Sequence, residues 1–422
     1  MTAAAIGTGA ASGRPGTPRR LAVVADDLTG ACDVGGELAA AGYVVRVQVD
    51  GAAAAGAPDA LYVVNTQSRS RAAATAARRV RRAVAAAPAD VLLKKIDTAL
   101  RGHLGAELAA ALEGAGAAAA FVLAAIPAAG RVTRGGCQWF GGRPLAATEF
   151  ARDPEGRAGT SSIPAVLAAE CGWPSAVVDV ETVRGGALAT RARALVRAGT
   201  RFVVVDAERE EDIEQAVGQI LSLPGPLCLA GSVALARALA RRLGPGSVAP
   251  GRGPLRVPPP CLVVSGSLHS QARAQVAALV AAGLAETVTV ATDDVAAPAG
   301  RARALLDTGR SVVVAPPAAA APPSAAAMRR IEERLAAATA AVVAGGAPAG
   351  LILVGGETSH AILRRIGACE LVLRGCPSLL LAVAEVAAGP ASGAVLATKG
   401  GSGGGIEALV ELLSDESRGE AP

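Results

Sequence analysis

Short runs of apolar residues recur along the chain and alternate with stretches rich in alanine and arginine that have a helical pattern. Before residue 243 the apolar runs are LAVVA (21–25), VVRVQV (44–49), LYVVN (61–65), VLLKK (91–95), AFVLAAI (120–126), SAVVDV (175–180), RFVVVD (201–206) and LCLAGS (227–232). Continuous apolar runs predict strands that are buried on both faces. Strands that alternate with helices are typical of a parallel sheet covered by helices.

The same alternation begins again after residues 243–259, a segment rich in proline and glycine that lacks periodicity. The second series of runs is CLVVSGS (261–267), ETVTVAT (286–292), SVVVAP (311–316), GLILVGG (350–356) and AVLATKGG (394–401). We therefore predict an α/β protein with two domains, residues 20–242 and 260–422, each a mostly parallel sheet flanked by helices, joined by a linker at 243–259. Residues 1–19 lack the hydrophobic core of a signal peptide and predict a disordered leader.

The composition narrows the class of protein. A chain of 422 residues is too long for one ordinary hydrophobic core, which supports two domains. The net charge of +5 is spread along the chain, and no apolar stretch reaches membrane-spanning length, so neither nucleic acid nor a membrane is an expected partner. The seven cysteines form no CxxC pair, which argues against a disulfide framework and a zinc site and favours the cytoplasm.

Two adjacent aspartates, Asp26 and Asp27, stand directly behind the first apolar run, where a turn and a helical pattern begin. Like charges repel, so structural need explains the pair poorly, although Asp27 alone could cap the following helix. Parallel strands end at one edge of their sheet, which would gather Asp97, Arg69 and Arg101 beside the pair. An arginine fork binds a carboxylate, and an aspartate can accept the proton of a hydroxyl. These residues predict a site for a small, anionic, polyhydroxylated molecule.

Three loops rich in glycine and serine follow apolar runs in the second half: SGSLHS (265–270), GGETSH (355–360) and KGGSGGG (399–405). The backbone N–H groups of such loops, and of helix N-termini, bind anions. Three of them at strand ends of one domain predict a nucleotide or polyphosphate site. The chain contains no GxxxxGK[ST] motif and no GxGxxG followed by an acid about 20 residues on, which argues against a P-loop and a dinucleotide site.

Seven segments, in this order along the chain, carry a resemblance to a known family. They are ADDLTGACD (25–33), TQSR (66–69), KKIDTALRGHLGAE (94–107), PAAGRVTRGG (127–136), SGSLHSQ (265–271), GGETSHAIL (355–363) and TKGGSGG (398–404). Together they resemble the four-carbon acid sugar kinases, which include threonate, erythronate and 3-oxo-tetronate kinases. Two segments depart from the family pattern. Residues 97–103 read DTALRGH where the family usually reads DSTLRGN, and residues 399–404 read KGGSGG where it usually reads KSGNFG.

The resemblance implies an amino-terminal domain that binds the sugar acid and a carboxy-terminal domain that binds ATP. Carried over by matching position, the residues implied on the acid-sugar side are Asp26, Asp27, Arg69, Lys95, Asp97 and Arg101. The residues implied on the nucleotide side are Ser265, Ser267, Gly355, Gly356, Glu357, Thr358, Ser359, Gly400, Gly401 and Gly403.

The function that the resemblance implies is ATP-dependent phosphorylation of a terminal hydroxyl on a four-carbon sugar acid. One aspartate of the pair Asp26 and Asp27 acts as general base, and Mg²⁺ bridges the nucleotide phosphates, with its protein ligands unassigned. Two alternatives stay open: a sugar-acid reductase or lyase, against which the missing dinucleotide motif argues, and a non-catalytic sensor of nucleotide and sugar acid. The stereochemistry of the acid and the oligomeric state, a homodimer included, also stay open.

Overall fold

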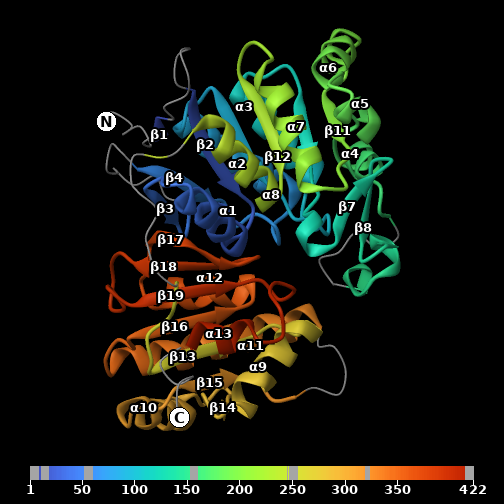
Figure 1. The fold of residues 1–422 in the computed structure, drawn as a ribbon. Helices are drawn as coiled ribbons and strands as arrows, with labels where there is room; N and C mark the ends of the chain where they lie inside the picture. Colours follow the sequence, from blue (N-terminus) through green and yellow to red (C-terminus); the bar gives the residue numbers. More distant parts are fainter. Residues whose placement is uncertain are drawn as a thin grey trace, which may run out of the picture. The chain divides into compact units, whose positions relative to one another are not determined.

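The computed structural model describes residues 9–10, 19–51, 60–152, 160–244, 246, 255–318 and 324–413. It divides into two compact units, Met1–Pro250 and Gly251–Pro422 (Figure 1). The predicted fold class is confirmed, because each unit contains a mostly parallel sheet flanked by helices. Most of the predicted leader, residues 1–19, and of the predicted linker, residues 243–259, lies outside the described residues. The domain bounds drawn from the sequence stay a prediction.

The first unit is built on a parallel sheet with the strand order β10–β11–β6–β12–β5–β2–β4–β3. Its strands are β2 (Arg20–Ala25), β3 (Val45–Gln48), β4 (Leu61–Asn65), β5 (Val91–Lys95), β6 (Ala120–Leu123), β10 (Ser175–Val178), β11 (Phe202–Val205) and β12 (Leu227–Gly231). Each lies within an apolar run predicted as a strand or extends it by one residue. Central positions such as Val63, Leu93 and Leu229 are fully buried, because helices cover both faces. A short β1 (Gly9–Ala10) pairs antiparallel with β2.

The helices of the first unit form two layers on this sheet. They are α1 (Leu28–Ala40), α2 (Ala73–Ala86), α3 (Leu104–Ala115), α4 (Ile163–Cys171), α5 (Val180–Arg184), α6 (Leu188–Arg197), α7 (Glu210–Leu221) and α8 (Val233–Leu243). On one face α2, α3 and α4 pack in sequence, and on the other α1, α8 and α7 do so. Helix α2 shows why these segments fold as they do: Ala76, Val80, Ala83 and Val84 are buried at helical spacing, while arginines occupy its outer face.

A small antiparallel sheet follows β6 and is absent from the sequence-based prediction. It consists of β7 (Arg131–Arg134), β8 (Cys137–Phe140) and β9 (Arg143–Pro144), flanked by the short 3₁₀ turns η1 (Pro127–Ala129), η2 (Leu145–Ala147) and η3 (Glu149–Arg152). Its strands are two to four residues long and carry arginine, glutamine and glycine turns, so they form no continuous apolar run.

The second unit contains the parallel strands β13 (Cys261–Ser265), β14 (Glu286–Thr289), β15 (Val312–Ala315), β16 (Gly350–Val354) and β19 (Val395–Lys399), in the order β19–β16–β13–β15–β14. An antiparallel pair, β17 (Glu370–Ser378) and β18 (Leu381–Val386), extends the sheet beyond β19. The sequence-based prediction misses β17, which alternates between buried and more exposed residues, and it also misses β18, although LAVAEV is apolar except for Glu385. The helices are α9 (Ser270–Ala281), α10 (Ala296–Asp307), α11 (Ala325–Ala344), α12 (Gly356–Arg365) and α13 (Ala408–Leu413).

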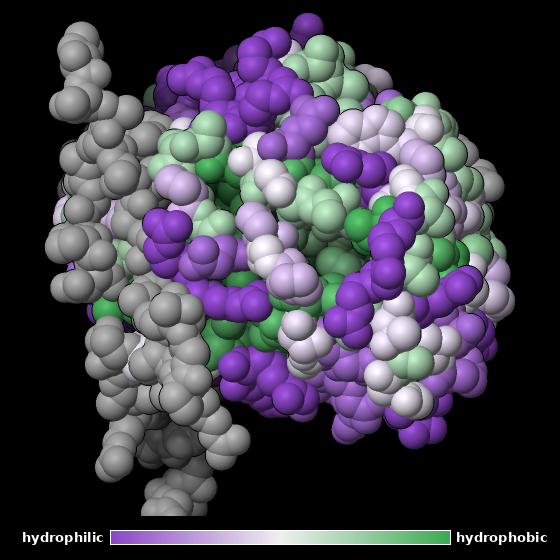
Figure 2. Space-filling view, turned by 90° about the horizontal axis from the view of Figure 1, so that it is seen from above, coloured by the Kyte–Doolittle hydropathy of each residue, from purple (hydrophilic) through white to green (hydrophobic). Residues whose placement is uncertain are grey.

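Hydrophilic side chains stand out over much of the face shown in Figure 2, and hydrophobic ones lie deeper between them. Among the described residues, every helix is too short or too polar to cross a bilayer.

Candidate active site

The two adjacent aspartates lie at the carboxyl end of β2, and both bind the guanidinium of Arg69, which follows β4. Nε of Arg69 donates to Oδ2 of Asp26 at 2.8 Å, and its Nη1 and Nη2 donate to Oδ2 and Oδ1 of Asp27 at 2.9 and 2.7 Å. The exposed fractions are 4% for Asp26, 4% for Asp27 and 8% for Arg69. Burial alone would lower the pKa of Arg69, but the surrounding aspartates outweigh it and raise that pKa well above its ordinary value. A shared buried cation therefore allows two like charges to stand side by side.

Asp27 also caps helix α1, as the alternative interpretation of this residue expects. Its Oδ1 accepts a hydrogen bond from the backbone N–H of Gly30 at 3.0 Å, and the hydroxyl of Thr29 donates to its Oδ2 at 2.7 Å. Gly30 permits this approach, because a Cβ there would lie 2.5 Å from Oδ1 of Asp27. All the bonding capacity of this carboxylate is directed at the protein.

Asp26 differs from its neighbour in having an oxygen to spare. Its Oδ1 is buried and has no hydrogen-bond partner within the described part of the chain. Burial would raise the pKa of Asp26, but the charges of Arg69, Lys94 and Lys95 outweigh burial and hold that pKa below its ordinary value. Asp26 is therefore a carboxylate at neutral pH with one acceptor atom not engaged by these residues.

The turn after β5 holds a second aspartate–arginine pair. Nε and Nη2 of Arg101 donate to Oδ2 and Oδ1 of Asp97 at 2.8 and 3.0 Å, and the backbone N–H of Arg101 donates to Oδ2 at 3.1 Å. Burial would raise the pKa of Asp97, but Arg101, Arg69 and Lys95 lower it to far below its ordinary value. The guanidinium groups of both Arg69 and Arg101, expected to bind a substrate carboxylate, thus each bind aspartates of the protein here.

Lys95, the last residue of β5, carries a cation with donors to spare. Its side chain is 6% exposed, and its Nζ donates to the carbonyl oxygen of Ile96 at 2.7 Å. No carboxylate oxygen of the described residues lies within 4.0 Å of this ammonium group. An ammonium group has three donors, so this one can bind an anionic ligand.

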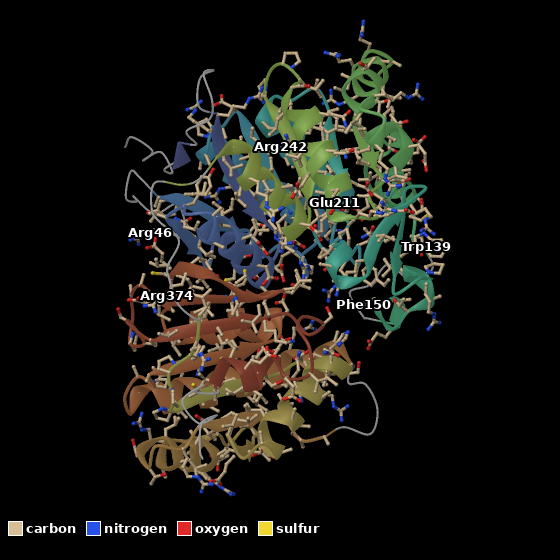
Figure 3. All side chains as sticks on the ribbon, in the orientation of Figure 1. Arg46, Trp139, Phe150, Glu211, Arg242 and Arg374 are labelled. Atoms are coloured by element: carbon tan, nitrogen blue, oxygen red, sulfur yellow. The ribbon has the colours of Figure 1, made fainter. Side chains whose placement is uncertain are left out.

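Arg131 is a residue of this region that the sequence reasoning left out, although it lies within a quoted motif. Its Nη1 donates to Oγ1 of Thr98 at 2.7 Å, and its Cζ lies 4.7 Å from the ring centre of Phe140. Burial lowers the pKa of Arg131 to about 10. Gln138 adds a hydrogen bond of 2.9 Å to the carbonyl oxygen of Thr98. The small sheet, on which Figure 3 labels Trp139, is thereby held against the turn after β5.

Lys94 and Glu107 were also left out. Nζ of Lys94 lies 2.7 Å from Oε2 of Glu107, and the hydroxyl of Ser68 donates to Oε1 of Glu107 at 2.6 Å. The rarity of lysine draws attention to Lys94, since the chain contains only Lys94, Lys95 and Lys399, but nothing in the sequence pairs it with Glu107. Both members lie in the segment KKIDTALRGHLGAE.

In the second unit, the three glycine-rich loops follow neighbouring strands. Ser265, Val354 and Lys399, the last residues of β13, β16 and β19, lie side by side in the parallel register. The loops pack closely: a Cβ at Gly266 would collide with Oγ1 of Thr358, and a Cβ at Gly401 would lie 2.5 Å from Oγ of Ser267. The nucleotide-side residues implied by the resemblance are therefore brought together within this unit.

The individual roles of these loop residues differ. Gly355 has a φ of 110° and donates its N–H to the carbonyl oxygen of Lys399 at 2.9 Å, so only glycine suits this position. The hydroxyl of Ser359 donates to the carbonyl oxygen of Gly355 at 2.6 Å and stabilises the start of α12. Gly400 borders open space, whereas a Cβ at Gly403 would lie 2.8 Å from the carbonyl oxygen of Leu380. Gly403 is thus required by packing.

Two glutamines of α9 hold the last glycine loop, and the sequence reasoning gave them no role. Nε2 of Gln271 donates to the carbonyl oxygen of Gly404 at 2.9 Å. Nε2 of the buried Gln275 donates to the carbonyl oxygens of Gly403 and Gly405 at 2.9 and 2.6 Å. The loop after β19 is therefore fixed to the helix that follows β13.

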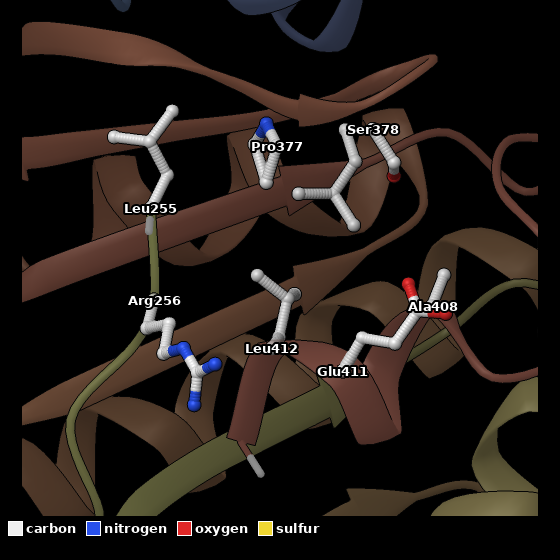
Figure 4. Close-up of a pocket in the computed structure, with 8 residues that line it drawn as sticks. Leu255, Arg256, Pro377, Ser378, Ala408, Glu411 and Leu412 are labelled. Carbon is white, nitrogen blue, oxygen red and sulfur yellow. The ribbon is translucent and has the colours of Figure 1, made fainter. Parts of the chain in front are cut away.

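A cavity of about 350 Å³ lies beside this loop, between the end of β17 and α13 (Figure 4). The residues that line it are Leu255, Arg256, Pro377, Ser378, Leu381, Ala408, Glu411 and Leu412. A Cβ at Gly404 would lie 3.8 Å from Oγ of Ser378, so the cavity adjoins the glycine loop. Its volume is in the range of small-molecule sites.

Family models match both units. The model described as "Sugar-binding N-terminal domain" matches residues 21–239, and the one described as "Nucleotide-binding C-terminal domain" matches residues 262–409. The chain is 33% identical over 308 residues to D-threonate kinase of Salmonella typhimurium, covering 70% of this chain and 71% of that protein. It is 36% identical over 286 residues to D-threonate kinase of Bordetella bronchiseptica, covering 65% and 66%. It is 34% identical over 202 residues to D-erythronate kinase of Heliobacterium modesticaldum, covering 46% of each chain.

Two crystal structures share the fold. A protein of Salmonella typhimurium LT2 superimposes with a TM-score of 0.74 at 22% identity, covering 93% of this chain and 98% of that one. The Haemophilus influenzae protein HI1011 does so with a TM-score of 0.65 at 20% identity and the same coverage of both chains. At these identities the likeness shows the fold alone.

Proposed function

The chain belongs to the four-carbon acid sugar kinase family, and on that premise we propose that it transfers the terminal phosphoryl group of ATP to a terminal hydroxyl of a four-carbon sugar acid. The acid is of the threonate, erythronate or 3-oxo-tetronate type, as in the names of the curated relatives.

The observation that carries the proposal is the environment of Asp26. Arg69 holds one oxygen of its carboxylate, and the other is buried and has no partner among the described residues. Leaving a buried acceptor without a donor costs about 1–3 kcal/mol, and a substrate hydroxyl supplies the missing donor. Because the pKa of Asp26 lies below its ordinary value, the residue is ionised and ready to accept the proton. A weak base suffices, since phosphoryl transfer depends mainly on positioning and on neutralising charge.

In the proposed step, the substrate hydroxyl oxygen forms a bond to the γ-phosphorus of ATP. The bond from that phosphorus to the β–γ bridging oxygen breaks, and the bridging oxygen keeps the electron pair and leaves with ADP. The hydroxyl proton moves to Oδ1 of Asp26. Asp27 and Arg69 hold Asp26 in place through the hydrogen bonds that they share.

The acid group of the substrate is assigned to the cations near Asp97. Lys95 has donors to spare, and Arg101 contributes its charge while bound to Asp97. Asp97, kept ionised by Arg101, suits the hydroxyl groups of the sugar acid.

On the nucleotide side, the loops at residues 265–267, 355–359 and 400–403 are assigned to the phosphates of ATP, through those backbone N–H groups that do not donate to a backbone carbonyl. The N–H of Gly355, which donates to Lys399, is not one of them. The positive φ of Gly355 and the tight packing of Gly401 fit a loop that a phosphate approaches closely. The cavity beside Gly404 is the proposed position of the nucleobase.

Mg²⁺ is expected with the nucleotide, where it neutralises phosphate charge. Within the described ranges, no three side chains of His, Cys, Asp or Glu cluster into a metal site. Proteins that bind Mg²⁺ with a nucleotide usually supply one or two carboxylates in addition to the phosphates, so a cluster of three side chains is not required.

The test is turnover of the purified protein with ATP, Mg²⁺ and a panel of four-carbon sugar acids, with ADP release and product mass both measured. Erythritol, which has the hydroxyl groups but lacks the carboxylate, is the matched control and should not be phosphorylated. Binding of ATP and an acid without any phosphorylated product would favour the sensor. Turnover of a nicotinamide cofactor with the same acids would favour the reductase, and ATP-independent cleavage of an acid would favour the lyase.

A homodimer and a cytoplasmic location remain predictions. Light scattering on the purified protein would decide the first, since a monomer mass would contradict it.

A further inference from the structure

A buried ion pair, formed by Lys94 and Glu107, lies near Asp26, the proposed base. Nζ of Lys94, on β5, lies 2.7 Å from Oε2 of Glu107, on α3, and the side chains are 0% and 4% exposed. Nζ of Lys94 also donates to the carbonyl oxygen of Lys95 at 2.9 Å. Removing two charges from water is costly, and an apolar pair of similar volume is often as stable. Stability alone therefore gives a poor reason for the pair.

The ion pair continues as a chain of hydrogen bonds to the loop after β4. The hydroxyl of Ser68 donates to Oε1 of Glu107 at 2.6 Å, so both oxygens of this carboxylate are bound. The hydroxyl oxygens of Thr66 and Ser68 lie 2.7 Å apart. Because the proton of Ser68 is directed to Glu107, the single hydroxyl proton of Thr66 is donated either to Oγ of Ser68 or to the carbonyl oxygen of Ala25, which is 2.8 Å away. Glu107 thereby fixes the side chain of Ser68 against the end of β2.

The backbone of the same loop reaches the two aspartates. The N–H groups of Ser68 and Arg69 donate to the carbonyl oxygen of Asp26 at 2.9 and 3.3 Å. The side chain of Arg69, in the same loop, binds the carboxylates of Asp26 and Asp27 through its guanidinium. A displacement of Ser68 would therefore move the guanidinium that orients Asp26.

We infer that Lys94 and Glu107 are positioning residues for phosphoryl transfer: they hold Ser68 and so set Arg69 and Asp26 in their working geometry. The inference rests on the proposed function, in which Asp26 accepts the substrate proton. Neither residue is assigned a contact with the reacting atoms. The pair also acts through charge, because Lys94 is one of the cations near Asp26. The charged groups around Asp26 are Asp27 beside it, Arg69, Lys94 and Lys95, with Glu107 behind Lys94.

The first test compares three variants with the wild type. Glu107→Gln removes the acceptor charge, and the double variant Lys94→Met/Glu107→Leu removes both charges while keeping the volume. Glu113→Gln is the matched control, since Glu113 lies on the same helix in an exposed ion pair with Arg81 at 2.9 Å. We expect kcat of the first two variants to fall by roughly 10- to 100-fold, because a displacement of about 1 Å at a catalytic group costs on the order of 10² in rate. KM for ATP and the kinetics of the control should not change.

The second test needs no turnover. Hydrogen exchange of the amides of Ser68 and Arg69, followed by mass spectrometry or NMR, should become faster in Glu107→Gln and in the double variant but not in Glu113→Gln. If the wild type phosphorylates none of the acids, the proposed function fails, while this exchange still decides the positioning role. Exchange and kcat equal to those of the control would overturn the inference. If Glu107→Gln fails to fold, the double variant decides, because it leaves no buried charge unpaired.

A pH profile separates positioning of the base from general support of the fold. Lys94→Met removes a cation near Asp26, so the pKa of Asp26 rises and the acid limb of kcat/KM moves to higher pH. Glu107→Gln leaves the cation in place, so the acid limb should not move to higher pH. A loss of rate that is uniform across pH in Lys94→Met would contradict the electrostatic part of the inference.

Discussion

Replacing each adjacent aspartate by asparagine should separate the chemistry of the site from its architecture. Asp26→Asn keeps a carbonyl oxygen that can accept the hydrogen bond from Nε of Arg69, now 2.8 Å from Oδ2. The buried Oδ1, which has no partner among the described residues, is replaced by an amide NH₂ group that cannot accept a proton. Loss of a general base costs about 10²–10⁴ in rate, or about 3–5 kcal/mol of activation free energy. We expect kcat to fall by that factor while ATP affinity is retained.

Asp27→Asn should act mainly on stability. An asparagine caps a helix about as well as an aspartate, so the hydrogen bond from Gly30 is preserved. Asparagine keeps one oxygen and replaces the other by an NH₂ group, which cannot accept a hydrogen bond. Of the two hydrogen bonds from Arg69, at 2.9 and 2.7 Å, one is therefore lost and the other loses the charge of its acceptor, and breaking a buried ion pair costs about 3–5 kcal/mol. At roughly 2–4 °C per kcal/mol for a unit of this size, the melting temperature should fall by about 6–20 °C. Asp26→Asn should cost less, because Arg69 keeps its paired contact with Asp27.

The assay combines steady-state kinetics on the preferred acid, calorimetric titration with ATP, and differential scanning calorimetry of both variants. The reasoning is refuted if Asp26→Asn turns over normally while Asp27→Asn loses turnover at a native melting temperature. If both variants turn over normally, the pair is structural and Asp97 becomes the next candidate for the base.

Arg101→Lys should raise KM for the sugar acid and leave KM for ATP unchanged, because lysine keeps the charge but cannot reproduce the fork that holds Asp97, the residue assigned to the sugar hydroxyls. Equal increases in both KM values would place Arg101 outside the acid site. Gly401→Ala should abolish nucleotide binding measured by calorimetry, because its Cβ would lie 2.5 Å from Oγ of Ser267. Gly300→Ala is the control in the same unit, because a Cβ there would have no atom within 4 Å. The pKa of Asp97 in the folded protein is far below 3.8, its ordinary value. Its contribution to the free energy of unfolding is therefore complete above pH 3.8 and is lost as the pH falls toward the pKa of the folded state. Urea unfolding from about pH 5 to pH 2 should therefore show a smaller loss of stability in Asp97→Asn than in the wild type, and parallel curves would contradict this assignment.

The sequence by itself determined the strands of the parallel sheets and the family. Runs such as LYVV and LILV are apolar without interruption, and such runs become strands buried on both faces. Because parallel strands end at one edge, the polar residues that follow them could be expected near one another before any contact was known. The strand β17 and the short strands β7–β9 were not predicted from the sequence, because none of them is a continuous apolar run.

Only the tertiary structure decided which charges are paired. The sequence does not show whether the guanidinium of an arginine binds a ligand or an aspartate of the protein. The guanidinium of Arg69 binds two aspartates that are 42 and 43 residues away in the sequence. The partners depend on the register of β2, β4 and β5 and on the turns that follow them. The same register leaves Oδ1 of Asp26 without a partner among the described residues, engages the carboxylate of Asp27, and buries Glu107 against Lys94. Local sequence cannot specify these contacts, because each joins segments that meet only when the sheet has formed.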